Sequence, residues 1–232
     1  MSDFPISNLL IMIFILVVLF IKYNLILYQK RKEQLRELSY KLKFTYSEKG
    51  NDLLLSRIEK YELFHKNVSQ NSTFVIDLCN VINGNYHGTD VTIFDVTALL
   101  RDLLKQPVAQ QTVIFFKSER LCFPFFRLLP KGDWKIIDIL DFPYINIKTN
   151  RKFSRRYVLQ SSNEDDIRKT FNEKVVAHLE KIPKKMKIRM AGEVDELIFF
   201  IPEALVSPKK IESFIEEKFE LLNLFIEASS MD

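Results

Sequence analysis

The sequence predicts an α+β protein in which one N-terminal transmembrane helix is followed by an antiparallel-sheet domain with packed helices. The prediction rests on one long apolar run, two pairs of segments that alternate apolar and polar residues, and amphipathic helical patterns between and after these pairs. No linker rich in Gly, Pro or Ser divides residues 43–228. We therefore expect a transmembrane anchor (1–28), a basic juxtamembrane helical stalk (29–42) and one soluble α+β domain (43–232).

The anchor is predicted from the apolar run that starts at Leu9. The run is unbroken to Ile21 and resumes at residues 25–28, after Lys22 and Asn24. With its flanks it reaches the ~20 residues that a helix needs to cross a bilayer. A cleaved signal peptide is the main competitor, but no basic segment precedes the run and no Ala-x-Ala site follows it. We therefore expect an uncleaved, single-pass anchor in the lipid bilayer.

Basic residues flank the apolar run on its C-terminal side. No basic residue precedes the run. We expect five basic residues to lie at the membrane interface: Lys22, Lys30, Arg31, Lys32 and Arg36. The positive-inside rule then places the N-terminus outside and the C-terminal domain in the cytoplasm.

Charge is concentrated in this segment. Against Glu33 and Glu37, the five basic residues give residues 22–37 a charge of 5 − 2 = +3, and Asp3 gives residues 1–21 a charge of −1. The whole chain carries +4, so residues 38–232 carry 4 − 3 + 1 = +2. A nearly neutral domain argues against nucleic acid as a partner.

The stalk carries leucines on one helical face. Leu35, Leu38 and Leu42 recur at helical spacing. Such a face can pack on the domain, or it can form a short seam in a weak homodimer, although sustained heptads are missing.

The first half of the domain reads mainly as strands. We expect a short strand at 44–47, a helix at 51–65, a hairpin of 74–79 and 86–96 turning at Asn83–Asn85, a short helix or loop at 98–105, a second strand pair at 111–117 and 121–129, and a helix at 132–140. Pro124 indicates an edge or a bulge in the second pair.

The second half reads as helices around another hairpin. We expect extended pieces at 145–148 and 157–160, one helix from a capping box at Ser161–Glu164 to Pro183, a hairpin turning near Gly192, and a final helix after Ser207-Pro208. Apolar residues stripe the predicted first helix at Ile167, Phe171, Val175 and Leu179.

Several chemistries lack their sequence signatures. His65, His87 and His178 are isolated from one another, and there is no Cys-x-x-Cys, no Gly-Lys-Ser/Thr loop and no Gly-x-Ser-x-Gly elbow. We expect no metal and no cofactor. Cys79 and Cys122 lie in apolar stretches, which predicts two buried, reduced thiols.

Two features leave alternatives open. Asp77 and Asp95 lie in the strands of the first hairpin and could act as a catalytic acid and base, or they could lie on the solvent face of a one-sided sheet. Residues 115–126 contain five phenylalanines, which suit either two core strands or a surface that touches a membrane or partner.

The order of several segments resembles a family of uncharacterised bacterial membrane-anchored proteins with a domain of unknown function. The residues that carry the resemblance are Gly88–Asp95, Gln111–Phe116, Leu121–Pro130 and Phe153–Tyr157, and it extends over residues 40–225. The resemblance implies a bacterial inner (plasma) membrane setting. It transfers no catalytic residue.

Three functions fit these observations. The first is a non-enzymatic cytoplasmic interaction or scaffold module with a protein partner, since a catalytic constellation is missing. The second is a lipid-surface sensor with a pleckstrin-homology-like sheet and C-terminal helix. The third is a hydrolase that uses the hairpin aspartates.

Overall fold

The structure is a computed structural model that describes residues 6–61, 74–100, 107–132, 142–147 and 150–230. Its helices are α1 (Ile6–Leu42), α2 (Asp52–Glu59), α3 (Arg151–Arg156), α4 (Glu164–Thr170), α5 (Glu173–Lys181), the 3-10 helix η2 (Pro208–Lys210) and α6 (Ile211–Ser229). Its strands are β1 (Thr45–Lys49), β2 (Phe74–Tyr86), β3 (Thr89–Leu100), β4 (Pro107–Lys117), β5 (Phe123–Pro130), β6 (Tyr144–Ile145), β7 (Tyr157–Ser161), β8 (Arg189–Val194) and β9 (Glu196–Phe200). The predicted α+β class is confirmed.

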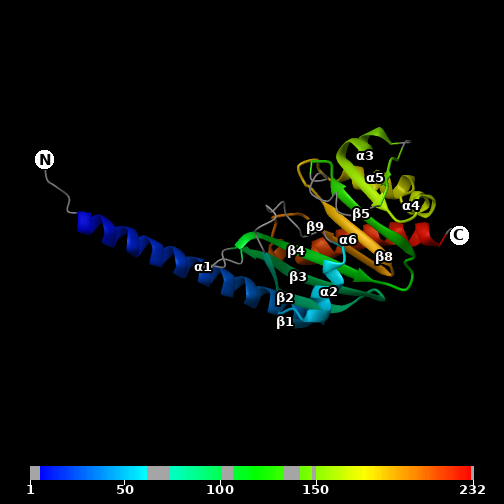
Figure 1. The fold of residues 1–232 in the computed structure, drawn as a ribbon. Coiled ribbons are helices and arrows are strands. Elements are labelled where there is room, and N and C mark those ends of the chain that lie inside the picture. Colours follow the sequence, from blue (N-terminus) through cyan, green and yellow to red (C-terminus); the bar gives the residue numbers. More distant parts are fainter. Residues whose placement is uncertain (1–5, 62–73, 101–106, 133–141, 148–149, 231–232) are drawn as a thin grey trace.

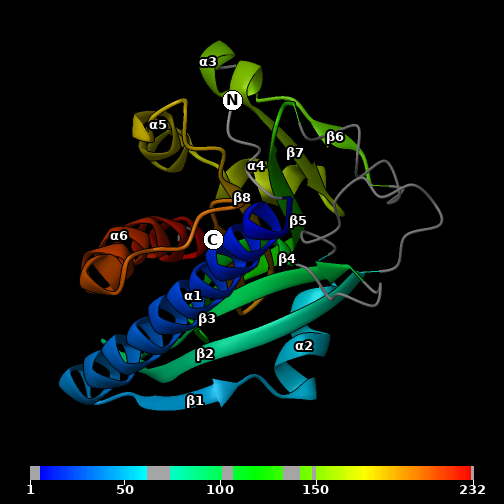
Figure 2. The same ribbon diagram turned by 90° about the vertical axis from the view of Figure 1, so that its left-hand side faces the viewer.

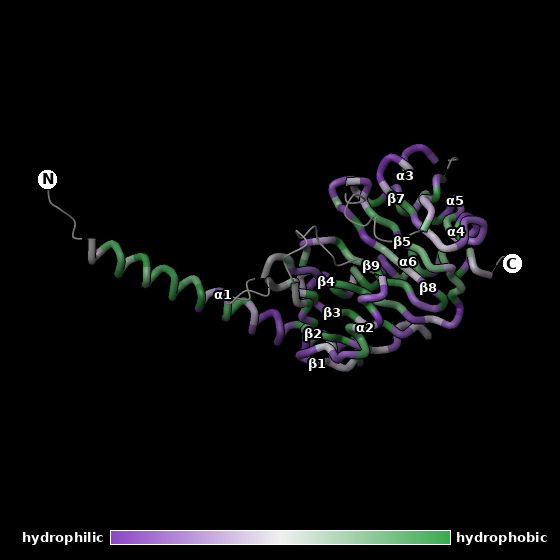
Figure 3. Tube along the Cα trace, viewed as in Figure 1, coloured by the Kyte–Doolittle hydropathy of each residue, from purple (hydrophilic) through white to green (hydrophobic). Residues whose placement is uncertain are grey.

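Helix α1 joins the predicted anchor and stalk without a break. Its 37 residues span about 55 Å at the helical rise, and its apolar N-terminal part projects away from the rest of the protein (Figures 1 and 3). By length and composition it can cross a membrane, and no other helix in the described part of the chain meets that test. Its last turns lie against the sheet, where Leu35 is only 2% exposed and Leu38 and Leu42 pack nearby. The leucine face therefore contacts the domain itself.

All the strands form one antiparallel sheet in the order β1-β2-β3-β4-β9-β8-β5-β7-β6. The prediction that residues 111–117 and 121–129 pair with each other is wrong. The later hairpin β8–β9 lies between these two segments, because β4 pairs with β9 and β5 pairs with β8 and β7. The irregularity expected at Pro124 is present as a register shift between Phe123 and Phe126.

Both hairpins turn at a different place from the one predicted. The first turns at His87–Gly88, where Gly88 has φ +79°, and the second turns at Asp195 after Val194 with φ 54°. The glycines expected in the turns lie in strands. A Cβ on Gly84 would come within 2.1 Å of the Phe44 ring, and one on Gly192 within 2.9 Å of the Glu196 carbonyl oxygen. These glycines therefore permit close packing rather than a reversal of the chain.

The sheet is covered on both faces. One face carries α6, the C-terminal turns of α1, and α3 to α5, whereas α2 lies on the opposite face (Figure 2). The Phe-rich stretch contributes to both cores, with Phe116, Phe123 and Phe126 on the first face and Phe115 on the second. The core interpretation of that stretch is therefore confirmed.

Glu196 ties α2 to the second face. Arg57 and Lys60 approach its carboxylate to 2.7 and 2.8 Å, and the Tyr61 hydroxyl donates to it at 3.0 Å. Burial alone would raise the pKa of Glu196, but the hydrogen bonds from Lys60, Arg57 and Tyr61 hold it below the ordinary value.

Two further expectations need correction. The single helix expected from residue 161 to Pro183 is two helices, because the Asn172 side chain accepts from the backbone of Lys174 and Val175 and starts a second helix. Asn163, rather than Ser161, caps the first. The helix expected at 132–140 lies almost entirely outside the described residues, and the segment expected from residue 98 as helix or loop continues β3 to Leu100.

Candidate functional site

The two candidate aspartates have different environments. Asp95 is buried at 4% exposure, whereas Asp77 is exposed. They are not register partners, since Asp95 pairs with Cys79 and Asp77 pairs with Thr97. The interpretation of Asp95 as a residue on a solvent face is wrong, because the stalk helix covers that part of the sheet. Asp77 remains at the surface.

Arg31 of α1 forms a two-pronged ion pair with Asp95. Its Nε donates to Oδ2 at 2.9 Å and its Nη2 donates to Oδ1 at 2.8 Å. The side chains are 14% and 5% exposed. Parallel hydrogen bonds between a guanidinium and a carboxylate are among the strongest polar contacts in proteins, and they fix orientation as well as distance.

Further hydrogen bonds complete this junction, which we define as Arg31, Asp95, Asn80, Thr112 and Val206. Asn80 and Thr112 donate to the carboxylate at 2.9 and 2.8 Å, and Arg31 Nη1 donates to the Val206 carbonyl at 2.7 Å. Thr112 also accepts from Arg31 at 3.1 Å and from the Val206 backbone at 3.0 Å. The junction therefore joins α1 to β2, β3, β4 and the segment before η2.

A break in strand regularity places Asn80 in the junction. The register of β2 shifts between Cys79 and Ile82, and Asn80 adopts a left-handed φ of 53°. Asparagine tolerates this conformation better than most residues. The Tyr46 hydroxyl of β1 donates to the Asn80 side-chain oxygen at 2.9 Å, which adds the edge strand to the network.

The other four basic residues expected at the membrane interface divide into two groups. Lys32 and Arg36 reach Glu48 of β1 at 2.5 and 3.1 Å, and Arg36 also pairs with Glu33. Lys22 and Lys30 are exposed and have no ion pair with a described residue. Contact of these residues with the membrane interface stays a prediction, but the charge of Arg31 is matched by Asp95 within the protein.

This arrangement suits attachment better than acid–base chemistry. The Asp95 carboxylate already accepts from Arg31, Asn80 and Thr112, so proton transfer would require part of the network to break. Burial, followed by the charges of Asp95 and Asp77, raises the pKa of the nearby Cys79 thiol to about 12, which keeps it protonated and poorly nucleophilic. Cys122, expected to be buried, is exposed; both cysteines are free.

The described residues contain no group of His, Cys, Asp or Glu that could hold a metal. His87 lies at the tip of the first hairpin, and His178 lies on α5, where burial and Lys218 lower its pKa. His65 lies outside the described residues.

One feature of the sequence points to the junction. Asp95 lies on the same strand face as the buried residues Val91 and Ile93, and a carboxylate in such a position needs a cation. Arg31 is three residues beyond the apolar run, but nothing in the sequence links it to a strand 64 residues away. The pairing depends on tertiary structure.

Comparison with known proteins shows the fold. No protein-family model matches the sequence, and no curated protein matches it significantly. A similar solved structure is that of the mycobacterial trehalose monomycolate transport factor A, TtfA, with a TM-score of 0.56 and 16% identity. The alignment covers 86% of this chain and 94% of that one. At this identity the similarity concerns the fold.

Proposed function

We propose that the protein is a non-enzymatic interaction module attached to the bacterial inner membrane, with its sheet domain in the cytoplasm. The observation that carries the proposal is the two-pronged Arg31–Asp95 ion pair between the apolar helix and the sheet. Arg31 lies about 4.5 Å along the helix axis beyond Tyr28, where the apolar run ends. The sheet is therefore fixed close to the end of the apolar segment, with one orientation relative to it.

A fixed orientation suits a module that presents one surface to a membrane-embedded partner. A flexible tether would be sufficient to keep a domain near a membrane, whereas α1 is continuous and is joined to the domain by both Leu35 and Arg31. TtfA, a protein of similar fold, is described as a transport factor for trehalose monomycolate. By analogy, we infer that the partner is a membrane protein that takes part in transport.

Two measurements test this proposal. The first fuses the C-terminus to a fluorescent protein that matures only in the cytoplasm, and separately to a phosphatase that is active only outside it. The second places a photocross-linking amino acid at Leu205, which is 40% exposed and precedes the Val206 contact of Arg31. The control position is Val194, which is 62% exposed. It lies beside the start of β9, which pairs with Lys117 at the end of β4 away from Thr112.

We expect cytoplasmic fluorescence, and an adduct with an integral membrane protein from Leu205 that is weaker from Val194. Arg31→Ala should reduce the Leu205 adduct because the domain is no longer held in place. Phosphatase activity would overturn the cytoplasmic placement. Equal adducts from both positions, unchanged in Arg31→Ala, would overturn the fixed presentation.

A lipid-surface sensor is the second candidate function, and one observation favours it. Lys209 and Lys210 of η2 are exposed and, like Lys22 and Lys30, have no ion pair with a described residue. Helix η2 lies beside α1, so these lysines could contact anionic headgroups. Hydrogen exchange of residues 201–210 in nanodiscs should then slow when anionic lipid replaces neutral lipid. Exchange that is the same in both lipids would exclude this candidate.

A further inference from the structure

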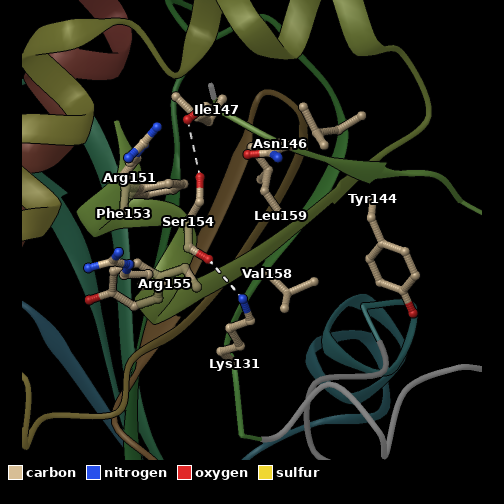
Figure 4. Close-up of a pocket in the computed structure, with 12 residues that line it drawn as sticks. Lys131, Tyr144, Asn146, Ile147, Arg151, Phe153, Ser154, Arg155, Val158 and Leu159 are labelled. Atoms are coloured by element: carbon tan, nitrogen blue, oxygen red, sulfur yellow. Dashed lines mark hydrogen bonds between the residues drawn. The ribbon is translucent and has the colours of Figure 1, made fainter. Parts of the chain in front are cut away.

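A groove at the β6–β7 edge of the sheet combines an apolar floor with a basic rim. It has a volume of about 620 Å³, within the range of small-molecule sites. Buried apolar side chains of β6, α3, β7 and the segment after β6 line it: Ile145, Ile147, Phe153 and Leu159. Tyr144 lies on the side of the groove opposite Arg151 and Arg155 (Figure 4). The groove is separate from the Arg31–Asp95 junction.

The described residues of the rim carry positive charge and no negative charge. Lys131, Arg151 and Arg155 line the groove, and none of its described lining residues is acidic. Arg151 and Arg155 are exposed and form no ion pair with a described residue. Among the described residues, Lys131 donates to the Ser154 carbonyl, at 3.3 Å (Figure 4). Arg155 also borders an adjoining hollow lined by Lys152, Arg156, Glu180 and Lys184. The rim therefore has guanidinium groups available for a carboxylate or phosphate.

A polar atom in the lining also lacks a partner. Tyr157 is 4% exposed, and its buried hydroxyl has no hydrogen-bond partner among the described residues. A buried hydroxyl without a partner is unfavourable, so the described protein groups leave this part of the lining unsatisfied.

We propose that this groove binds a single-chain anionic amphiphile. The chain lies against Ile145, Phe153 and Leu159, and a carboxylate or phosphate headgroup lies against Arg151 and Arg155. Both parts of the lining are needed to define this ligand. An uncharged apolar molecule would leave Arg151 and Arg155 without a partner, and a small anion would leave the apolar floor in contact with water. This inference is independent of the proposed scaffold function.

The test uses the full-length protein in nanodiscs of uncharged phospholipid. A palmitate probe that carries a photoreactive diazirine is cross-linked, and the labelled peptides are identified by mass spectrometry. We expect labelling within residues 144–159. Unlabelled palmitate should displace the probe, whereas hexadecanol, the uncharged alcohol with the same chain, should not. Competition by a monoacyl phosphate would show which headgroup is preferred; displacement by either anion supports the proposal.

Two variants separate the rim from the floor. Arg151→Ala/Arg155→Ala should weaken displacement by palmitate by about tenfold or more, since two charged donors are lost. Val158→Trp fills part of the half-buried lining and should reduce labelling while the charges remain. The matched control Lys43→Ala/Lys49→Ala removes two exposed positive charges at the opposite, β1 edge of the sheet and should bind as the wild type does.

Three results would overturn the proposal. The first is labelling confined to α1. The second is displacement of the probe by hexadecanol that is as effective as displacement by palmitate. The third is equal binding by the Arg151→Ala/Arg155→Ala variant and its lysine control. Thermal unfolding of each variant, measured in the same nanodiscs, shows whether a loss of binding reflects a loss of folding.

Discussion

Arg31→Ala is expected to loosen the membrane helix from the sheet. The substitution leaves the Asp95 carboxylate, at 5% side-chain exposure, without its cation. Removal of one partner from a buried ion pair costs about 3–5 kcal/mol. We expect about 3 kcal/mol, because the Arg31 side chain is 14% exposed and Asn80 and Thr112 still donate to the carboxylate. At about 2–4 °C per kcal/mol for a domain of this size, the melting temperature should fall by about 6–12 °C.

The matched control is Arg36→Ala, one and a half turns further along the same helix. Arg36 is 35% exposed and its partners Glu33 and Glu48 are 56% and 55% exposed, so its ion pairs should contribute at most about 1 kcal/mol. Thermal unfolding by near-ultraviolet circular dichroism would be measured on full-length protein in neutral nanodiscs. Hydrogen exchange of residues 29–42 would show whether the stalk opens.

A double-mutant cycle with Arg31→Ala and Asp95→Ala isolates the pair. Residues in direct contact should show an interaction energy of about 1 kcal/mol or more. Two results would refute the reasoning: a melting temperature for Arg31→Ala equal to that of Arg36→Ala, or an interaction energy near zero. In either case Leu35 and its apolar neighbours, rather than the ion pair, would hold the helix.

Three further predictions concern other parts of the domain. Because the pKa of Glu196 is below its ordinary value of 4.5, the carboxylate stabilises the folded protein above that pH, and this stabilisation is lost as the pH falls through the folded-state pKa. The difference in melting temperature between the wild type and Glu196→Gln should therefore shrink in acid; a difference that grows would contradict the Arg57, Lys60 and Tyr61 contacts. Gly192→Ala should destabilise the protein by about 1–3 kcal/mol in chemical denaturation, because a Cβ would meet the Glu196 carbonyl oxygen at 2.9 Å, whereas Gly132→Ala, with nothing within 4 Å, should have little effect. A maleimide should label exposed Cys122 in the folded protein and buried Cys79 only after denaturation, and rapid labelling of both would show that β2 is open in solution.

Local features of the fold follow well from the sequence. The apolar run, the alternation in the two hairpins and the Ser207-Pro208 start signal each depend on neighbouring residues, and each predicts an element that the structure contains. Strand order is different, because β4 and β5 are close in the chain and yet β8 and β9 lie between them. Nothing in the local pattern of residues 107–130 indicates pairing with strands β8 and β9, which begin only at residues 189 and 196.

The candidate site could be predicted only in part. Asp95 stands out as a carboxylate in an apolar strand, but its role depends on Arg31, which the sequence places among residues expected at the membrane interface. The glycines show a similar difficulty. Gly84 and Gly192 look like turn residues in sequence, although their function is to admit the Phe44 ring and the backbone near Glu196.

The insertion of β8–β9 between β4 and β5 also determines the order in which the protein can be assembled during synthesis. Ribosomes add about 5–20 residues per second, and β9, the second of the two strands that pair with β4, begins only at residue 196. Until then, the edge of β4 that faces β9 and the edge of β5 that faces β8 have no strand beside them, and such edges promote aggregation. The apolar part of α1 leaves the ribosome before the strands do. Insertion of this helix into the bilayer during synthesis would hold each nascent chain apart from other copies until β8 and β9 are made. Early insertion would therefore protect the unfinished sheet from aggregation.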